Sequence, residues 1–527
     1  MYLPSLFGNF VWDDEDFVYA NQYVKEFRVE KFFTSSITEG RGKGSNYFRP
    51  MQYVIYSTAH ALFGFNPFWY HLTNVLVHIA AAAAIFYFFA LLIRPPTFAF
   101  LISLIFLVHP VQTEAVSYIS GLSDPLYVLF GFLSLIFASK TRKTAIVSKA
   151  GVISLLFFLL SLLSKETGLV FFGLIALYSF LTSILTHIDE RINVKFNATE
   201  VIRKVFSRIF AYGLIAIIYL WYHYTYINNF DIKGAWGNNL YSNSLAARLI
   251  LFTQNIYTYL TLLFFPKDLF MERDLTIKIQ TVILNPKTII FVLVNSIIVL
   301  YFIHKFRTNN FVLLMFFYLA FWICWIPYSG LVLINGIFYE HFLYLPLVFF
   351  FGFLITLVNG VIARGEATKQ SVTATKNRLP RSLRSLAMTG LALWLIVLAG
   401  RNIVRQYDWI DNERFYKQTL SYVPDSLRMR NGLGMVYADK GDMDGAIREY
   451  SIALQKYPSI PTLYHNLGNA YASKGEINKA EQFYLQAINL DPKFAFSYQA
   501  LANLYQQTGQ KEKLAAFLKH SNLRVAQ

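Results

Sequence analysis

Long apolar runs separated by short charged segments limit what this sequence can fold into more than any other feature. An α-helix needs about 20 apolar residues to cross a bilayer, and runs near this length recur between residues 68 and 401. Only 15% of the 527 residues are charged, whereas soluble domains carry about 25%. The sequence therefore predicts a polytopic membrane protein. The ten predicted spans are 68–92, 97–117, 122–138, 146–163, 168–186, 206–226, 287–304, 311–328, 338–360 and 385–401.

The basic residues between the apolar runs predict which way each span crosses the membrane. Cytoplasmic loops carry an excess of Lys and Arg, and the basic clusters share one side only if 227–286 begins and ends on the opposite, exoplasmic side. The N-terminal 60 residues and everything after Arg401 then lie outside as well. The apolar stretch 245–265 contains Gln254 and Asn255, so we interpret it as an interfacial or re-entrant helix. These clusters also explain the net charge of +16, which therefore does not indicate nucleic-acid binding. They lie within 139–149, 187–208, 305–307 and 361–384.

The C-terminal part of the chain repeats itself with a period of 34 residues. Small residues, tyrosines and glycines recur in register, in a pattern that resembles the tetratricopeptide repeat. Residues 402–424 are predicted as a lead-in helix and 425–527 as the repeats, of which the third ends near His520. Such arrays bind peptides or partner proteins on a concave surface, although a purely structural cap is the alternative. The aligned residues are Gly434, Gly468 and Ala502; Tyr437, Tyr471 and Tyr505; and Gly441, Gly475 and Gly509.

Ionisable residues recur in the segments that this topology places outside the membrane. Charges close to the hydrocarbon region are costly and usually functional, although any one of them could be an interfacial anchor or a helix cap. A carboxylate can deprotonate an acceptor hydroxyl, and a cation can neutralise a departing phosphate. Such a set suits transfer from a lipid-phosphate donor, but composition alone does not exclude a proton-coupled transporter. The candidates are Asp13, Asp14, Arg49, Glu114, Asp124, Lys165, Glu166, Arg273, Glu340 and His341.

The order of several short motifs resembles the GT-C membrane glycosyltransferases, and most closely the transmembrane and tetratricopeptide-repeat O-mannosyltransferase family. The resemblance covers nearly the whole chain and implies an all-α fold, a transmembrane helical bundle followed by a repeat solenoid. That family has eleven spans, and the ten found here match its second to eleventh. We therefore expect the natural protein to begin about 20 residues or more upstream of Met1 with an apolar helix; the alternative is that Met1 is the true start and that the 68–92 span translocates loop one. The motifs are 10–21, 49–50, 62–67, 109–116, 121–124, 164–168 and 340–346.

The resemblance also implies a mechanism and roles for the candidate residues. Asp13 or Asp14 would activate an acceptor hydroxyl, with Asp13 preferred because it is the first acidic position of the motif. The hydroxyl would attack a polyprenyl-phosphate sugar, with mannose as the candidate, and the reaction would invert the anomeric carbon. His341 departs from the family pattern, since many relatives have arginine there, so its contact with phosphate would be weaker or pH-dependent. The donor phosphate would lie on Arg49, Lys165, Arg273 and His341, and the sugar, acceptor or metal site on Glu114, Asp124, Glu166 and Glu340.

Two other functions stay open at this point. The chain could be a non-catalytic membrane scaffold whose repeats recruit partners for envelope assembly, or a transferase that acts on a lipid glycan. The repeats favour a protein acceptor, such as Ser or Thr of an exported protein. No cofactor is required by the sequence, and a divalent metal ion is compatible with it. The short repeat array indicates a bacterial or archaeal cell membrane, with loop one (1–67) and the repeats on the exoplasmic or periplasmic side of the 68–401 domain.

Overall fold

The computed structural model describes residues 1–141, 148–189, 198–227, 240–273, 285–305, 309–334, 336–370 and 381–521. Within these ranges the regular structure is helical and contains no β-strand, which confirms the predicted all-α class. The chain divides into two compact units, Met1–Ile410 and Asp411–Gln527.

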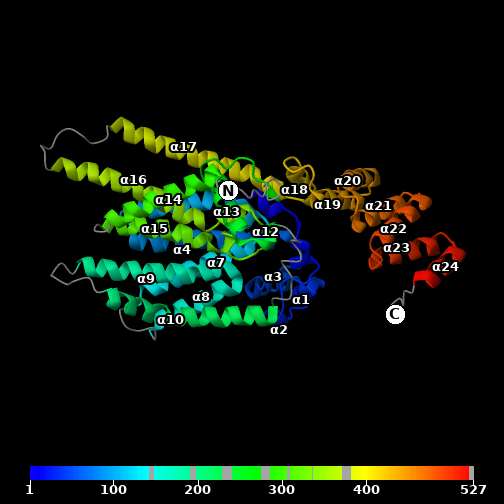
Figure 1. Cartoon of the computed structure of the whole chain (residues 1–527), viewed down its shortest axis with the longest axis horizontal. Helices are drawn as coiled ribbons and strands as arrows, with labels where there is room; N and C mark the ends of the chain where they lie inside the picture. The colour runs from blue at the N-terminus through cyan, green and yellow to red at the C-terminus, as the bar shows by residue number, and fades with distance from the viewer. Residues whose placement is uncertain are drawn as a thin grey trace. The chain divides into compact units, whose positions relative to one another are not determined.

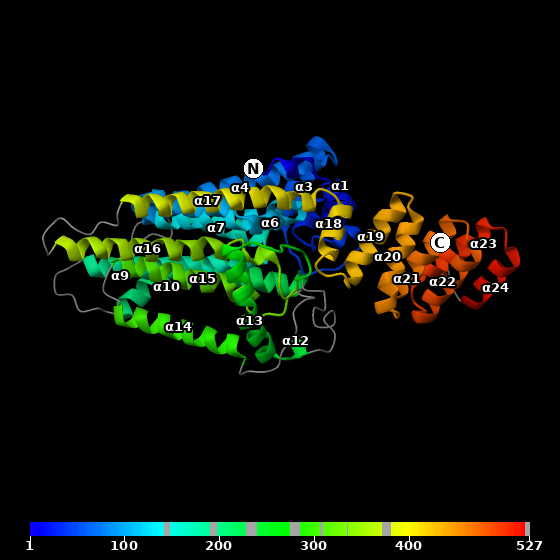
Figure 2. The ribbon, with the colours of Figure 1, turned by 90° about the horizontal axis from the view of Figure 1, so that it is seen from above.

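The first unit is a bundle of long helices. Figures 1 and 2 show these helices side by side, with α1–α3 at one end of the bundle. The C-terminal end of α16 and the N-terminal end of α17 lie at the other end. Loop one therefore folds over one end of the bundle as short helices. The bounds are α1 Gln22–Lys25, α2 Val29–Phe32, α3 Pro50–Phe63, α4 Pro67–Leu92, α5 Thr97–Val108, α6 Thr113–Ser117, α7 Ser123–Ser139, α8 Lys149–Ser164, α9 Val170–Asp189, α10 Ala198–Tyr222, α12 Leu240–Asn243, α13 Leu245–Phe264, α14 Pro286–Lys305, α15 Asn309–Trp325, α16 Pro346–Gln370 and α17 Arg381–Gln406.

Several of these helices are long and apolar enough to cross a membrane, so the chain is an integral membrane protein. Five described helices qualify, and a sixth is obtained if α5 and the following Pro110–Ser117 segment, bent by 53°, form one span. Three shorter apolar helices, Lys149–Ser164, Pro286–Phe302 and Pro346–Val358, coincide with further predicted spans, and 206–226 falls largely in α10. The five are Pro67–Leu92, Ile119–Ser139, Glu166–Ile184, Phe311–Tyr328 and Met388–Trp409.

Two predicted spans differ from the helices that the structure shows. The 97–117 span breaks at His109, because Pro110 has no N–H to continue the helical hydrogen-bond pattern. The 338–360 span begins later, at Pro346, with a separate 3₁₀ turn over Glu340–Leu343. Much of the sequence that oriented the spans, including Arg142, Lys143, Arg191, Lys195 and 371–380, lies outside the described residues.

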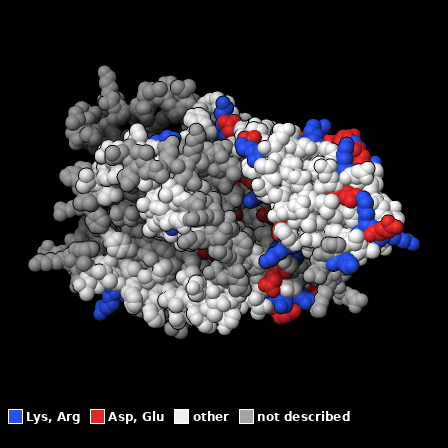
Figure 3. Space-filling view, turned by 45° about the vertical axis from the view of Figure 1, so that its right-hand side comes forward, with Lys and Arg blue, Asp and Glu red and all other residues white. Residues whose placement is uncertain are grey.

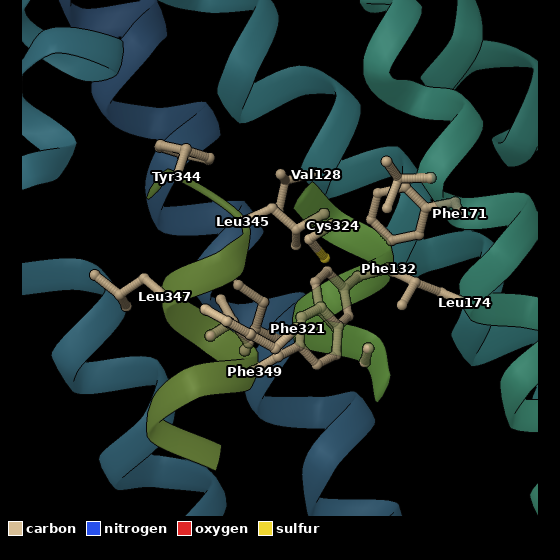
Figure 4. Packing of buried hydrophobic residues seen from close by; sticks show 14 of the residues in the cluster. Val128, Phe132, Phe171, Leu174, Phe321, Cys324, Tyr344, Leu345, Leu347 and Phe349 are labelled. Atoms are coloured by element: carbon tan, nitrogen blue, oxygen red, sulfur yellow. The ribbon is translucent and has the colours of Figure 1, made fainter. Parts of the chain in front are cut away.

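Aromatic side chains fill the middle of the bundle and hold its helices in register. Figure 4 shows Phe132 of α7, Phe171 of α9, and Phe349 of α16 packed together, with Cys324 of α15 beside them. The ring centroids of Phe132 and Phe171 are 5.7 Å apart, and those of Phe132 and Phe349 are 6.3 Å apart. Small residues permit this close approach: a Cβ on Gly131 would lie 2.0 Å from the Phe171 ring. This core fixes the relative positions of α7, α9 and α16, whose N-terminal ends adjoin candidate site residues.

The second unit is a stack of helical hairpins with the predicted tetratricopeptide register. Gly441, Gly475 and Gly509 end the first helix of each pair with φ between 70° and 82°, a left-handed conformation that glycine adopts without strain. In Figure 3 charged side chains gather around the right-hand part of the surface, and few appear on the described atoms of the left-hand part. The range 402–424 contains the end of α17, a 3₁₀ turn at Tyr407–Trp409 and α18, rather than one helix. The helices are α18 Asn412–Leu420, α19 Leu427–Asp439, α20 Met443–Lys456, α21 Pro461–Ser473, α22 Ile477–Leu490, α23 Ala495–Gln507 and α24 Lys511–Ser521.

The close packing within each repeat pair gives a testable expectation. A Cβ on Gly468 would lie 2.5 Å from ring atoms of Tyr484, so Gly468→Ala should destabilise residues 411–527 by about 1–3 kcal/mol through overpacking. Adding Tyr484→Leu should restore part of the loss, because the third repeat combines Ala502 with Leu518 at these positions. Thermal unfolding of residues 411–527, followed by circular dichroism, measures both changes. Equal stability of Gly468→Ala and the unmodified unit would contradict this packing.

Candidate active site

The two aspartates of loop one have opposite environments. Asp13 is exposed, whereas Asp14 is fully buried. The Asp14 carboxylate accepts hydrogen bonds from the backbone N of Val11 at 2.9 Å, and from the N and Oγ of Ser120 at 2.7 and 2.6 Å. Trp12, between these residues, has φ of 59°, a conformation that a bulky residue adopts only when its surroundings enforce it. Asp14 therefore fixes the turn to the bundle, and Asp13 stands on it facing outward.

Burial, with a smaller contribution from Asp13, raises the pKa of Asp14 to about 7, although its three hydrogen bonds act in the opposite direction. The folded protein therefore binds a proton at Asp14 more tightly than the unfolded chain does. The stability contributed by this group is fully present below about pH 4 and is lost as the pH rises through about 7. We expect thermal unfolding in detergent to show the wild type losing stability between about pH 4 and pH 7. Asp14→Asn should remove part of that slope, and an unchanged slope would contradict the assignment.

Two ion pairs lie close together at this end of the bundle, one fully buried and one whose carboxylate is partly exposed. The Lys165 Nζ donates to both carboxylate oxygens of Asp124, at 2.7 and 2.8 Å, and both side chains are more than nine-tenths buried. The Nε of Arg49 lies 3.9 Å from Glu166, whose other oxygen accepts a 2.8 Å hydrogen bond from the backbone N of Phe48. The guanidinium of Arg49 lies 4.6 Å from the Tyr47 ring centroid, within the range of a cation–π interaction. Four predicted residues thus form one cluster, which we call the Lys165 cluster: Arg49, Asp124, Lys165 and Glu166.

A second set of charges surrounds the turn at Glu340. His341 donates its backbone N to Glu114 at 3.0 Å, and its Nδ1 lies 2.7 Å from the other Glu114 oxygen. Glu340 lies 3.4 Å from Arg405, a residue absent from the set predicted by sequence. Burial raises the pKa of Glu340 to about 7, although Arg405 and Arg273 oppose this and Glu114 adds to it. We call this set the Glu340 cluster: Glu114, Arg273, Glu340, His341 and Arg405.

The predicted phosphate ligands differ in their remaining bonding capacity. The buried Nε of Arg49 has no hydrogen-bond partner, and Lys165 has three N–H donors, of which Asp124 accepts two. His341 has Nδ1 taken by Glu114, which leaves Nε2 for another partner. The Arg273 guanidinium lies 4.2 Å from the Phe270 ring centroid. Arg49 and Lys165 therefore retain N–H donors that an anion could accept.

The described part of the chain contains no preformed set of metal ligands. No group of three or more His, Cys, Asp or Glu side chains there is arranged to hold an ion. A divalent ion at the predicted acidic residues therefore stays a prediction.

Several side chains that sequence reasoning missed connect these clusters to loop one. These residues lie outside the motifs named above, and only one of them carries a charge. They are Arg405, Trp409, Tyr118 and Ser120. Tyr118 nevertheless interacts electrostatically with both Asp13 and Asp14. The charge of Arg405, one helical turn after Arg401, is the only feature of the sequence that points to this residue. Its position lies in the predicted exoplasmic lead-in, with no motif around it.

Comparisons with known proteins find tetratricopeptide repeats in this chain and relatives that are named protein O-mannosyl-transferases. Family models described as "TPR repeat" and "Tetratricopeptide repeat" match residues 434–475, 461–494 and 483–513. Human "Protein O-mannosyl-transferase TMTC2" is 32% identical over 142 residues, which cover 26% of this chain and 17% of that protein. Human TMTC1 is 31% identical over 193 residues, covering 34% and 22%. The Caenorhabditis elegans relative F38B6.6, also named a protein O-mannosyl-transferase, is 30% identical over 184 residues, covering 32% and 24%.

The matched segments thus span about a fifth of the length of these curated relatives. A solved structure of a MamA mutant is 20% identical and covers 25% of this chain and 71% of its own, with a TM-score of 0.19, too low to bear on the fold. The sequence matches and the repeats together confirm the predicted resemblance: the chain is related to the transmembrane and tetratricopeptide-repeat family whose members are named protein O-mannosyl-transferases.

Proposed function

We propose that this chain is an inverting membrane glycosyltransferase that uses a polyprenyl-phosphate sugar, with mannose as the candidate, and glycosylates a hydroxyl of an exported protein. The observation that carries the proposal is the pair of aspartates in loop one. A buried Asp14 holds the turn rigidly, and the exposed Asp13 lies where an acceptor can reach it. A positioned carboxylate of this kind is suited to general-base catalysis.

The reaction needs a base and a stabilised leaving group. In the proposed step the Asp13 carboxylate takes the proton of a Ser or Thr hydroxyl. The hydroxyl oxygen forms a bond to the anomeric carbon as the bond from that carbon to the phosphate oxygen breaks. The bonding electrons leave with the polyprenyl phosphate, and attack opposite the leaving group inverts the carbon.

Arg49 and Lys165, the two cations of the Lys165 cluster, are the proposed ligands of this leaving group. Arg49 and Lys165 retain donor capacity, and charge-assisted bonds to phosphate oxygens are among the strongest hydrogen bonds in proteins. Asp124 and Glu166 hold these two cations in place before the donor arrives. Such preorganisation removes the need to reorient charges during the reaction. Glu114 and Glu340 are proposed to bind sugar or acceptor hydroxyls.

The repeats support the proposed protein acceptor, and the basic loops support the proposed side of the membrane. The relatives are named for transfer to protein, and a repeat array suits recognition of a polypeptide. We propose that loop one and the repeats face the exoplasm or periplasm of a bacterial or archaeal cell.

Cysteine labelling tests this orientation directly. In a Cys324→Ser background, Val372→Cys and Ile460→Cys should react from opposite sides of the membrane with an impermeant thiol reagent, because 361–384 is basic. The native Cys324 is buried, so its replacement removes background without altering an exposed site. Reaction of both positions from the same side would overturn the orientation.

Mass spectrometry tests the function itself. Exported glycoproteins and lipid-linked glycans are compared between cells with and without the protein, and purified protein is incubated with a polyprenyl-phosphate mannose donor. Loss of hexose from specific Ser or Thr residues supports the proposal. Loss of hexose from a lipid glycan alone indicates a lipid acceptor. If neither pool changes and the envelope complexes fail to assemble instead, the result supports a scaffold.

A further inference from the structure

The C-terminal end of α17 and the residues that follow it contact both the start of loop one and the Glu340 cluster. Asn402 donates to the hydroxyl of Tyr2 at 3.0 Å, and the backbone N of Asn9 donates to the carbonyl of Ile410 at 2.7 Å. The backbone N of Ser5 donates to Gln406 at 3.3 Å. The start of loop one is therefore hydrogen-bonded to the end of α17 and to the residue that follows the Tyr407–Trp409 turn.

Arg405 is the charged residue at the centre of this contact. Its side chain is 3% exposed, and it donates to Asp408 at 2.8 Å and to Glu340 at 3.4 Å. Its guanidinium carbon also lies 5.8 Å from the ring centroid of Trp409. A buried arginine is stable only when its charge is compensated, so its partners are held together around it.

The contact continues from Arg405 to the aspartates of loop one. Trp409 stacks on Tyr118 with ring centroids 5.2 Å apart and an interplanar angle of 29°. The backbone of Tyr118 is fixed by Asn74, which donates to its carbonyl at 2.9 Å. Two residues later, Ser120 donates two hydrogen bonds to Asp14. One continuous set of contacts thus runs from Glu340 through Arg405, Trp409 and the 118–120 turn to Asp14.

We propose that Arg405 is a positioning residue of the proposed transferase: by contacting Glu340 and Trp409 together, it fixes the distance between the Glu340 cluster and the turn that carries Asp13. This inference rests on the proposed function, but the geometry it describes can be measured without activity. Arg405 itself need not touch the substrate. Its planar guanidinium makes several contacts at fixed angles, which a lysine ammonium cannot do.

The kinetic test compares Arg405→Gln with Arg401→Gln in the full-length protein. Arg401 lies one turn earlier on α17 and donates to the carbonyl of Pro266. With polyprenyl-phosphate mannose as donor, Arg405→Gln should lower kcat about 10- to 100-fold with a smaller effect on the donor KM, as expected for misplacement of a reacting group. Arg401→Gln should match the wild type.

The pH profile adds a measurement that a merely structural residue would not change. Glu340 faces Arg405, Arg273 and Glu114, and the two arginines favour its ionised form. Removing Arg405 should therefore move the acidic limb of the kcat profile to higher pH, whereas Arg405→Lys should move it less.

Thiol labelling separates a failure of this inference from a failure of the proposed function. With Asp13→Cys and Cys324→Ser, the rate at which the new thiol reacts should change several-fold when Arg405→Gln is added, and should not change with Arg401→Gln. If the wild type shows no transfer, this rate still tests the positioning role. If Arg405→Gln does not fold, Arg405→Lys replaces it in each assay. A folded variant with wild-type kcat, pH profile and labelling rate would overturn the proposal.

Discussion

Replacing Asp13 by asparagine is expected to reduce sugar transfer by about two to four orders of magnitude, the usual contribution of a general base. The change removes the carboxylate that would accept the hydroxyl proton and retains the shape of the side chain. Because Asp13 is exposed, the fold should tolerate the change, and the melting temperature should stay close to that of the wild type. Transfer from a polyprenyl-phosphate donor to an acceptor peptide is the measurement.

A matched control lies two residues away. Glu15 is also exposed and acidic, and it pairs with Arg41 at the surface. Glu15→Gln should therefore leave transfer within about twofold of the wild type, since exposed ion pairs contribute little. Asp14→Asn should lower activity as well, but together with stability, because Asp14 is the buried hydrogen-bond acceptor of the turn. Full activity in the Asp13→Asn, Asp14→Asn double variant would favour the scaffold instead.

The parts of the fold that the sequence predicts are those set by local periodicity. Apolar runs locate the helices, because bilayer thickness fixes their length. The repeat register follows from glycines such as Gly468, whose lack of a side chain is required by the facing Tyr484. Pro110 also indicates the helix break at His109, but a prediction based on the length of the apolar run alone does not detect it.

The pairings within the site depend on contacts that no local pattern encodes. Glu114 and His341 are 227 residues apart and meet only because α6 and the turn before α16 pack against each other. From the sequence, His341 is predicted to bind the donor phosphate, but in the structure its Nδ1 contacts the buried carboxylate of Glu114. Asp13 and Asp14 are adjacent and chemically identical, and only the folded turn distinguishes an exposed side chain from a buried one. Arg405 was missed for the same reason, since its partners come from distant segments.

The pair formed by Lys165 and Asp124 carries the largest expected effect on stability. Both side chains are buried, and each charge is compensated chiefly by the other. Lys165→Met leaves the Asp124 carboxylate without its cation, and breaking a buried pair in this way costs about 3–5 kcal/mol. The variant should also bind the donor more weakly, because one of the two proposed phosphate ligands is lost.

Removing both partners distinguishes the cost of an unpaired charge from the loss of the lysine itself. Lys165→Met with Asp124→Leu should recover most of the stability, since an apolar pair of similar volume is often as stable as a buried ion pair. The same double variant should not recover donor binding if Lys165 contacts the phosphate. Lys204→Met, which breaks an exposed pair with Glu200 on α10, should cost less than about 1 kcal/mol and is the matched control. Thermal unfolding in detergent measures the stability, and donor titration measures the donor affinity. A Lys165→Met protein as stable as Lys204→Met would show that the pair is not buried as described. Donor affinity restored in the double variant would exclude Lys165 as a phosphate ligand.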